Sequence, residues 1–575
     1  MCDVVFITPS FEAKLECESI GTLQLATILQ QNGILCEILP FHRIGDVRLF
    51  DLFLSNTIKL LEERKPRIVS FYCRCDTYHI ILRLAEHIKS QLPNVYIVCG
   101  GPQADITAEE TLHQISWIDY ICCGEGEETI YPFFSSLLQG TPALTIPGLV
   151  YRAGDQVIKN PLPALIQSLD SIPLPDYSLM QNLDLDAIKK QIFIIDVGRG
   201  CPFGCTFCST NRFWGRNYRL KSPYRIIEEV RKAYEDYGVT YFQFSHDMFT
   251  LDRKKVKETC ELLSNLNLPI RWNCSARLDC VDEELIDTMA QAGLTSIYFG
   301  IETGSARMQK IIKKRLNLNR TIEILSHMKS KGLRATASFI YGFPEENEED
   351  ISQTLSLVAQ ILQLRSTRVQ MHLCAFMVGT ELTEMYEKEM TPAEVYSDQT
   401  GEYAVEECKD LIQKHPKLFQ QLMEYKTDLR AKLKYFSLFI KVWYSMLPAY
   451  QYISEHYPQN RLIEMYYDFL EANADALSYS ECLDTKKRLL YVISQDKLYQ
   501  KFSEDEHYDK LADSCRLMAA VHSDEVQNGG SITDIYCVDP AYLSKDMPLQ
   551  EYPQCFAKVT IKNGKYYSET IMLEE

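Results

Sequence analysis

Three cysteines lie within eight residues in the segment "GRGCPFGCTFC", which runs from Gly198 to Cys208. Cys201, Cys205 and Cys208 follow the spacing C-x3-C-x2-C. Thiolates at such short spacing are typical ligands of zinc or of an iron–sulfur cluster. Both kinds of site usually take four protein ligands, and the next cysteine, Cys260, belongs to a segment with the apolar periodicity of a helix. The sequence therefore predicts a site with three protein thiolates.

Two kinds of metal site fit three thiolates. A zinc ion could complete its coordination with a distant histidine. Alternatively, a cubane cluster held by three thiolates keeps one iron open to an exogenous ligand. Glycines beside the cysteines let backbone amides approach the cluster sulfides and tune the cluster potential, which favours the cluster.

Strand-like and helix-like segments alternate around the cysteines and must position them. The apolar segments 239–250, 270–279, 296–314, 334–346 and 369–382 predict strands, and helical periodicity covers 222–237, 252–266, 281–292, 318–332 and 348–363. This alternation predicts a parallel α/β barrel. Chemistry in such a barrel collects at the C-terminal ends of the strands.

The first 140 residues show an alternation of their own. Strands are expected at 3–10, 34–41, 67–73, 95–102 and 119–128, with a helix at 20–32. This order predicts a doubly wound parallel sheet, which binds ligands beyond the carboxyl ends of its strands. Gly100 and Gly101 follow one strand and Gly124 and Gly126 follow the next, so a ligand could approach the backbone closely there.

Bulk properties exclude several classes of function. The chain of 575 residues has a net charge of −18, which argues against binding to nucleic acid or to an anionic membrane. It contains no run of about 18 apolar residues and starts without a basic leader, so we expect a cytoplasmic protein without a membrane span. The other cysteines lie mostly in apolar surroundings, where reduced, buried thiols are expected.

The three-cysteine loop and the barrel pattern resemble the radical S-adenosylmethionine (radical SAM) superfamily. The resemblance implies a [4Fe–4S] cluster on the three cysteines, whose open iron binds S-adenosylmethionine (AdoMet). No catalytic residue is assigned beyond the cluster. The implied AdoMet contacts are Asp247 for the methionyl amine, Ser275 and Arg277 for ribose or carboxylate, and Glu302 and Ser305 for the nucleoside. Arg277 could equally form an ion pair at the barrel rim.

The motifs "CGGPQA" and "CCGEGEE" and the segment 162–180 resemble the cobalamin-binding class of radical SAM enzymes. The implied cobalamin contacts are Ser70, Arg74, Gly100, Gly101, Pro102, Gly124, Glu125, Gly126 and Glu127. The histidine that replaces the lower cobalt ligand in other cobalamin domains is absent from the loop after the first strand. His42 begins an H-x-x-G sequence after the second strand, which we interpret as a chance match.

The loop after the third strand, "YCRC" at 72–75, is placed to cover the lower face of the cobalt. Arg74 would be a poorly coordinating cap that favours a reactive methyl group. It could also pair with corrin propionates or remain solvated. A metal site on Cys73 and Cys75 is disfavoured because no second pair of ligands accompanies them.

The sequence thus predicts an α/β protein with an N-terminal doubly wound parallel sheet, a partial (β/α)6 barrel and a mostly helical C-terminal domain with a small β tail. The expected boundaries are 1–140 for the cobalamin-binding-like domain, 141–190 for a linker, 191–385 for the barrel and 386–575 for a substrate-recognition domain. Within the last region, 403–523 has helical character and 558–573 predicts a hairpin through Asn563 and Gly564.

The resemblance implies a cobalamin-dependent radical SAM methyltransferase. Such an enzyme moves a methyl group from AdoMet via methylcobalamin to an unactivated carbon of a natural product or peptide, with electrons from a donor such as flavodoxin or ferredoxin. One alternative is a cyclase, rearrangement enzyme or peptide-modifying enzyme that uses AdoMet only as a radical source. Another is a sensor protein that binds the cofactors without catalysis.

Overall fold

A computed structural model shows how these segments fold. It describes residues 2–12, 19–180, 192–364, 366–394, 396–397, 400, 403–433, 436, 535–538, 555–562 and 565–572. Most of the C-terminal helical character expected at 403–523 lies outside the described residues. The chain divides into two units: one contains 1–298, 312–315 and 374–426, and the other contains 299–311, 316–373 and the remainder from 427.

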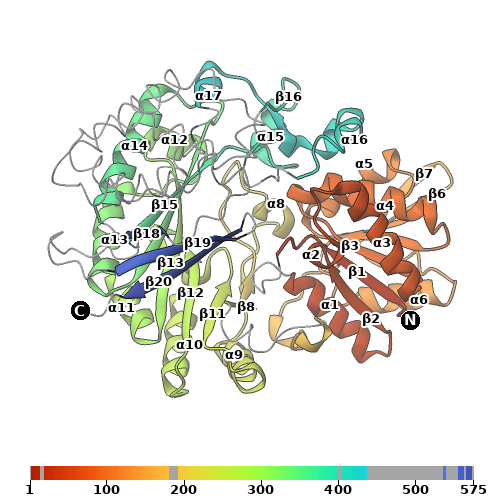
Figure 1. Ribbon diagram of the computed structural model, residues 1–575, viewed down its shortest axis with the longest axis horizontal. Coiled ribbons are helices and arrows are strands. Elements are labelled where there is room, and N and C mark those ends of the chain that lie inside the picture. Colours follow the sequence, from red (N-terminus) through yellow and green to blue (C-terminus); the bar gives the residue numbers. More distant parts are fainter. Residues whose placement is uncertain are drawn as a thin grey trace. The chain divides into compact units, whose positions relative to one another are not determined.

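The N-terminal part of the first unit is a seven-stranded sheet in the order β2-β1-β3-β4-β5-β6-β7 (Figure 1). Its strands are β1 Val4–Thr8, β2 Cys36–Pro40, β3 Ile68–Tyr72, β4 Tyr96–Gly100, β5 Tyr120–Cys122, β6 Leu149–Ala153 and β7 Gln156–Lys159. The first five are parallel, as the sequence predicts. The antiparallel hairpin β6–β7 extends the sheet within residues that were expected to be a linker.

Helices cover both faces of this sheet. They are α1 Ile20–Gln31, α2 Phe41–Ile44, α3 Phe50–Arg64, α4 Tyr78–Gln91, α5 Pro102–Gln114 and α6 Ile130–Leu138. Helix α1 packs with α6, and α3 packs with α4 on the opposite face, which is the arrangement of a doubly wound fold. Ser19 caps α1 by accepting a hydrogen bond from the Thr22 backbone amide at 3.2 Å. The side chains of β1 are buried throughout, as expected for a central parallel strand.

The first unit also contains the first half of the barrel. Its strands are β8 Phe193–Asp196, β11 Tyr241–Ser245, β12 Arg271–Ala276 and the beginning of β13 Leu294–Glu302, in the sheet order β8-β11-β12-β13. Helices α9 Pro223–Tyr237, α10 Arg253–Asn265 and α11 Glu283–Gln291 connect them. Between β8 and α9, the cysteine loop runs from β9 Gly198–Arg199 through α8 Thr210–Trp214 to β10 Arg219–Leu220.

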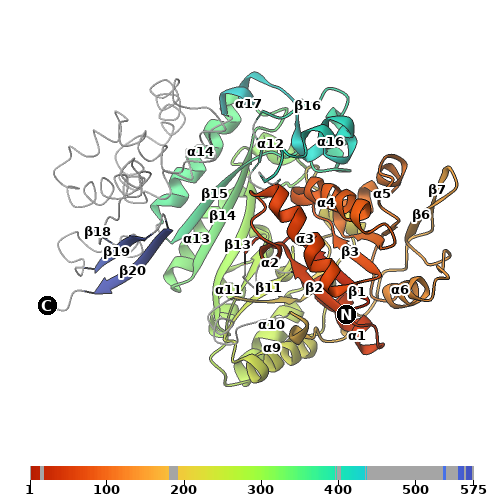
Figure 2. The ribbon, with the colours of Figure 1, turned by 45° about the vertical axis from the view of Figure 1, so that its right-hand side comes forward.

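The chain after the barrel packs back against the helices of the N-terminal sheet. Residues 374–426 contain α15 Glu381–Tyr386, β16 Thr391–Pro392, α16 Lys409–Lys414 and β17 Met423–Glu424. Helix α16 lies next to α4 (Figure 2). Cys408 and Phe419 are fully buried in the core of the N-terminal sheet, and Gln103 donates a hydrogen bond to the Leu418 carbonyl at 3.0 Å.

The second unit holds the end of β13, then β14 Arg334–Tyr341 and β15 Thr367–Leu373 in the order β13-β14-β15. Its helices are α12 Ala306–Ile311, α13 Thr321–Ser330, α14 Glu348–Gln363 and α17 Asp428–Leu433. A three-stranded sheet contains β18 Ile535–Val538, β19 Cys555–Lys562 and β20 Lys565–Met572. Strands β19 and β20 pair antiparallel with Lys562 opposite Lys565 (Figure 2), which confirms the predicted hairpin.

None of the described helices combines the length and apolar character needed to cross a bilayer.

Candidate functional site

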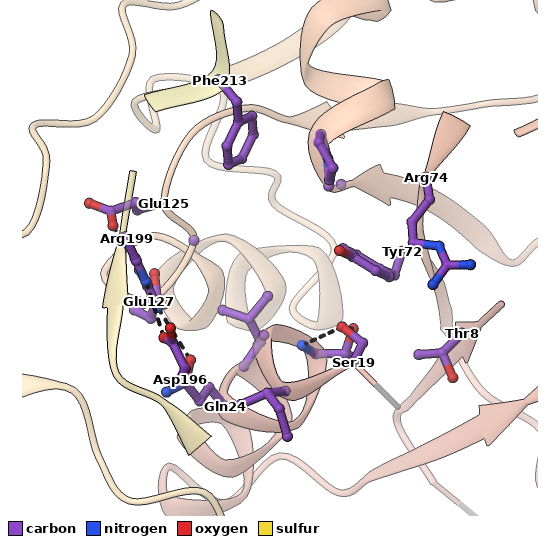
Figure 3. A pocket seen from close by; sticks show the side chains of 18 of the residues that line it. Thr8, Ser19, Gln24, Tyr72, Arg74, Glu125, Glu127, Asp196, Arg199 and Phe213 are labelled. Carbon is purple, nitrogen blue, oxygen red and sulfur yellow. Dashed lines mark hydrogen bonds and ion pairs between the residues drawn. The ribbon is translucent and has the colours of Figure 1, made fainter. Parts of the chain in front are cut away.

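A cavity of about 670 Å³ lies in the first unit, where the carboxyl ends of the N-terminal strands face the cysteine loop and the ends of β8, β11 and β12 (Figure 3). Predicted site residues that line it are Ser70, Arg74, Gly100, Gly101, Pro102, Gly124, Glu125, Gly126, Glu127, Asp247 and Ser275. Both predicted cofactor regions therefore contribute to one cavity.

Glycines form the sheet side of the cavity because no other residue fits there. Gly101 has φ = 97°, and a Cβ atom at this position would lie 2.8 Å from the Tyr72 ring and 2.9 Å from the Cys73 carbonyl oxygen. Gly124 has φ = 79°, and its Cβ would lie 2.9 Å from Pro163. The backbone thus reaches the cavity without side chains, which suits a large, flat ligand.

Tyr72 and Arg74 lie at the end of β3. Figure 3 shows the Tyr72 ring reaching toward the middle of the cavity and Arg74 along its edge. The Arg74 guanidinium forms an ion pair with Asp76, and its side chain stays partly exposed at the cavity. Burial raises the pKa of the Tyr72 phenol, which keeps it neutral.

Cys73 points away from the solvent at the same strand end. Its side chain is fully buried, its thiol donates to the Phe71 carbonyl at 3.8 Å, and burial raises its pKa well above the usual value. Burial raises the pKa of Cys75 to about 12. Both sulfurs are therefore protonated thiols in this environment.

The cysteine loop is closed at its base by the antiparallel pairing of β9 and β10, with Arg199 opposite Arg219. Gly200 has φ = 81°, and a Cβ atom there would lie 2.0 Å from the Asn217 carbonyl oxygen. A Cβ on Gly204 would lie 2.3 Å from the Arg216 guanidinium. Gly200, before the first cysteine, and Gly204, between the first two, therefore allow the loop to fold back closely on its own C-terminal stem.

The three predicted metal ligands are reduced and partly exposed. Burial raises the pKa of Cys201 to about 11, with further contributions from Cys208 and Cys205. Burial also raises the pKa of Cys208, against a hydrogen bond from Thr210. Thiols with raised pKa values, such as Cys201 and Cys208, need a strongly positive ligand to deprotonate them, and iron in a cluster would supply that charge.

The arrangement of these thiols distinguishes between a cluster and a single ion. Among the described residues, no three His, Cys, Asp or Glu side chains converge as ligands of one metal ion would. A four-coordinate zinc site requires such convergence. A cubane presents a separate iron to each thiolate, so its ligands need not point to one centre. A loop with three cysteines at this spacing supplies the three thiolates that such a cluster would take.

Two of the predicted AdoMet residues of the first unit face the cavity. Asp247 and Ser275 line it from the ends of β11 and β12. The Asp247 carboxylate is open to the cavity, yet the surrounding protein raises its pKa by desolvation, against a hydrogen bond from Thr210. Among the described residues no Lys or Arg forms an ion pair with Asp247, and such a carboxylate is suited to bind an ammonium group.

Arg277 has a different role. Its guanidinium is buried, forms an ion pair with Asp279 at 2.9 Å and donates to the Lys314 carbonyl at 2.9 Å. It also lies 4.0 Å from the centre of the Phe203 ring, within the cysteine loop. Arg277 therefore packs against Phe203 of the cysteine loop. Its ion pair with Asp279 agrees with the ion-pair alternative.

The remaining predicted nucleoside contacts belong to the second unit. Glu302 ends β13 in the left-handed region, with φ = 68°, and strain of this kind is common at ligand sites. The Ser305 hydroxyl donates to Asp350 at 2.5 Å, and Arg307 also pairs with Asp350. Ser305 thus stabilises the turn after β13.

His42 stays outside the cavity. It belongs to the short helix α2, and its Nδ1 atom contacts the Ser10 carbonyl oxygen at 3.3 Å. Burial lowers the pKa of His42, so the imidazole is neutral. Its position supports the interpretation of H-x-x-G as a chance match.

The sequence analysis missed a buried ion-pair network at the cavity wall. The Glu125 carboxylate accepts from Arg199 at 2.7 Å and from Arg219 at 2.9 Å. Arg199 also pairs with Glu127 and Asp196 (Figure 3). The available sequence signal was the position of Arg199 between a buried strand and Cys201, where an arginine needs a partner.

Trp214 completes this network. The guanidinium groups of Arg199 and Arg219 lie 5.7 and 5.6 Å from the centre of its ring. The two arginines therefore share one aromatic neighbour as well as one carboxylate, which fixes both stems of the cysteine loop.

Comparison with known proteins places these features in a family. The sequence model of the radical SAM superfamily matches residues 195–358, and the model of the B12 binding domain matches residues 10–132. An uncharacterized methyltransferase of Pyrococcus horikoshii is 32% identical over 311 residues, covering 54% of this chain and 68% of the relative.

Further relatives differ in the activities their names give. An anaerobic magnesium-protoporphyrin IX monomethyl ester cyclase of Cereibacter sphaeroides is 28% identical over 365 residues, covering 61% of this chain and 58% of the cyclase. The solved structure of the radical SAM methyltransferase TsrM from Kitasatospora setae, with cobalamin and a [4Fe–4S] cluster, aligns with a TM-score of 0.57 and 16% identity. That alignment covers 68% of this chain and 77% of TsrM.

The two matching domains, together with the cavity that their loops line, support one family assignment. The superfamily acts on small molecules or peptides and requires a reductant. The chain belongs to the radical SAM superfamily, among the enzymes that combine a radical SAM domain with a B12-binding domain and use a [4Fe–4S] cluster, AdoMet and cobalamin.

Proposed function

We propose that this enzyme transfers a methyl group from AdoMet to a carbon atom of a small molecule or peptide. The observation that carries the proposal is the single cavity lined both by the glycine loops of the N-terminal sheet and by the barrel residues around Asp247. A cobalamin on one side and an AdoMet on the other would then share one solvent-restricted space.

The protein's own residues have distinct tasks in this proposal. Gly100, Gly101 and Gly124 give a flat corrin access to backbone. Cys201, Cys205 and Cys208 would hold the cluster, and Asp247 would bind the AdoMet amine. When bound, the cobalt supplies a methyl carrier, and the cluster supplies the electron that cleaves AdoMet to a radical source.

The substrate and the electron donor are proposed only as classes of molecule. We propose a natural product or a peptide as the substrate, selected by the C-terminal part of the chain from residue 386 onward. We propose flavodoxin or ferredoxin as the source of electrons. The name of the Pyrococcus relative supports methyl transfer as the reaction class.

The test does not require knowledge of the substrate. The chain is reconstituted with iron, sulfide and hydroxocobalamin, reduced, and incubated with AdoMet. Formation of S-adenosylhomocysteine that depends on cobalamin would show that AdoMet is a methyl donor. Formation of 5′-deoxyadenosine alone, at the same rate with and without cobalamin, would contradict methyl transfer.

A radical cyclase is the second candidate, because a relative with that name matches 61% of this chain. It predicts 5′-deoxyadenosine without S-adenosylhomocysteine. The same incubation therefore separates the two functions, and loss of both products in a variant without the three cysteines is the control.

A further inference from the structure

Glu125 lies in the predicted cobalamin loop, but its side chain is directed at the cysteine loop. The side chain is only 2% exposed. Its Oε1 atom accepts from Arg199 Nη1 at 2.7 Å, and its Oε2 atom accepts from Arg219 Nη1 at 2.9 Å and from the Ile166 amide at 2.7 Å. One carboxylate therefore receives three hydrogen bonds, two of them from cations.

The two arginines belong to the two stems of the cysteine loop. Arg199 is in β9, two residues before Cys201, and Arg219 is in β10. The stems also pair with each other through the backbone, and the Lys221 amide donates to the Val197 carbonyl at 3.0 Å. Glu125 thus joins both ends of the loop that carries the cluster ligands.

The backbone on either side of Glu125 faces the cavity. Gly124 and Gly126 both line it, and Gly124 is fixed by a hydrogen bond from its amide to Asp105 at 2.7 Å. Any ligand that orders this short loop also orders the Glu125 carboxylate, and through it the stems. Breaking a buried ion pair leaves uncompensated charges, which is unfavourable. A displacement of the Glu125 loop should therefore move the two arginines and their stems with it.

We propose that Glu125 is a positioning residue that couples the two cofactor sites, so that cobalamin binding and cluster binding strengthen each other. The inference rests on the cofactor assignment and does not require methyl transfer. Coupling between two binding sites is reciprocal, so a cluster that tightens cobalamin binding must be stabilised by cobalamin to the same extent.

The chain offers a matched control for Glu125. Glu37 in β2 is also a buried glutamate and accepts two hydrogen bonds from the Arg64 guanidinium, both at 2.8 Å. Neither residue lines the cavity. Glu37→Gln therefore removes the same kind of interaction from the same unit without touching the stems of the cysteine loop.

The test measures the dissociation constant of hydroxocobalamin before and after reconstitution of the cluster. In the unmodified enzyme, we expect the cluster to tighten cobalamin binding by about 5- to 10-fold, at the lower end of typical couplings. In Glu125→Gln, the ratio should fall to 1, and in Glu37→Gln it should stay at the unmodified value. A ratio of 1 in the unmodified enzyme, or an unchanged ratio in Glu125→Gln, would overturn the inference.

A second variant keeps the test decisive if Glu125→Gln does not fold or binds no cobalamin. Arg219→Met leaves Glu125 and its bond to Arg199 in place and removes the link to β10. Hydrogen exchange of the 198–220 peptide should slow on hydroxocobalamin addition in the unmodified enzyme, and this response should be lost in Arg219→Met. Equal slowing in both would contradict the coupling, whereas absence of bound cobalt in the unmodified enzyme would refute the cofactor assignment as well.

Discussion

The two sides of the cavity are built on different principles. On the sheet side, Gly100, Gly101 and Gly124 present bare backbone, and the nearby side chains of Tyr72 and Cys73 are held neutral by burial. The barrel side instead concentrates chemistry-bearing side chains, with Asp196, Arg199, His246 and Asp247 at strand ends and the three cysteines in the adjoining loop.

This difference indicates two modes of recognition. The sheet side selects a ligand by shape, because a Cβ atom at Gly101 would collide with the backbone. The barrel side selects by ligation and charge. Substitutions on one side should therefore affect mainly one cofactor, and the other only through the coupling at Glu125.

The largest effect is expected from the cysteines. Replacing Cys201, Cys205 and Cys208 together by alanine should reduce iron from about four atoms per chain to none, because a cluster has no other thiolates in this loop. Cobalt should persist after reconstitution with excess hydroxocobalamin, because the proposed coupling lowers the cobalamin affinity by only about 5- to 10-fold. Metal analysis of the desalted protein measures both, and complete loss of cobalt together with iron would show that the two sides are not separate.

The corresponding experiment on the sheet side of the cavity is Gly101→Val. The new side chain meets the Cys73 carbonyl and adopts an unfavourable φ, at a cost of about 1–3 kcal/mol. We expect cobalamin binding to weaken by roughly tenfold or more, since 1.4 kcal/mol corresponds to a factor of ten, with iron content unchanged.

Gly140→Ala is the matched control for Gly101. Gly140 also has a positive φ, of 73°, but nothing lies within 4 Å of the position of its Cβ. This variant should lose a little stability and retain cobalamin affinity. Weaker cobalamin binding in Gly140→Ala would mean that backbone strain, rather than contact with the ligand, explains the effect.

Asp247→Asn should affect AdoMet alone. Replacing the carboxylate by an amide removes a charged acceptor for the methionyl amine, and such hydrogen bonds contribute about 1.5–3 kcal/mol. We expect AdoMet affinity to fall by roughly tenfold or more in a titration of the reconstituted enzyme, with iron and cobalt unchanged. The exposed Asp236→Asn should leave affinity as it is, and equal losses in both variants would exclude the proposed role.

The last prediction concerns how the free energy of unfolding depends on pH. Burial lowers the pKa of His246 to about 4, below the value of about 6.5 in an unfolded chain. The unfolded chain therefore takes up the proton first, and stability falls as the pH drops from 6.5 toward 4 while remaining constant above 6.5.

His246→Asn tests this assignment because the amide oxygen can replace Nδ1, which accepts from the Met248 amide at 2.7 Å. The unmodified protein should lose about 2 kcal/mol more than the variant between pH 7 and pH 5, as calculated from the shift of the pKa. Denaturant unfolding at both pH values gives the difference. Equal losses would show that His246 is not the group that titrates.

The sequence could predict those parts of the fold that depend on local pattern. Strands β1 to β5 and the barrel elements from α9 to β15 follow apolar periodicity, and the glycines at 100, 101 and 124 mark the strand ends. The three cysteines identify the cluster because their spacing is local. Hairpin β6–β7 carries a weaker apolar pattern at the edge of the sheet and was not predicted.

Long-range pairings could not be predicted in the same way. Arg199 and Glu125 are 74 residues apart, and Arg219 and Glu125 are 94 apart, so no local pattern links them. The contacts of Arg277 with Phe203 and Lys314 could not be predicted for a similar reason, because these residues become its neighbours only in the folded barrel. The partners of charged residues beside buried strands are thus what the three-dimensional structure adds most to the sequence-based prediction.

The most direct test of a shared cavity is the magnetic interaction between the two metal centres. The reconstituted enzyme is poised so that the cobalt is Co(II), and the power saturation of its electron paramagnetic resonance is measured with the cluster oxidised and then reduced. If both cofactors occupy the cavity, reduction of the cluster will accelerate relaxation of the cobalt signal or split it, because dipolar coupling is strong only at short range. An unchanged cobalt signal, with both metals present in full amount, would contradict the account.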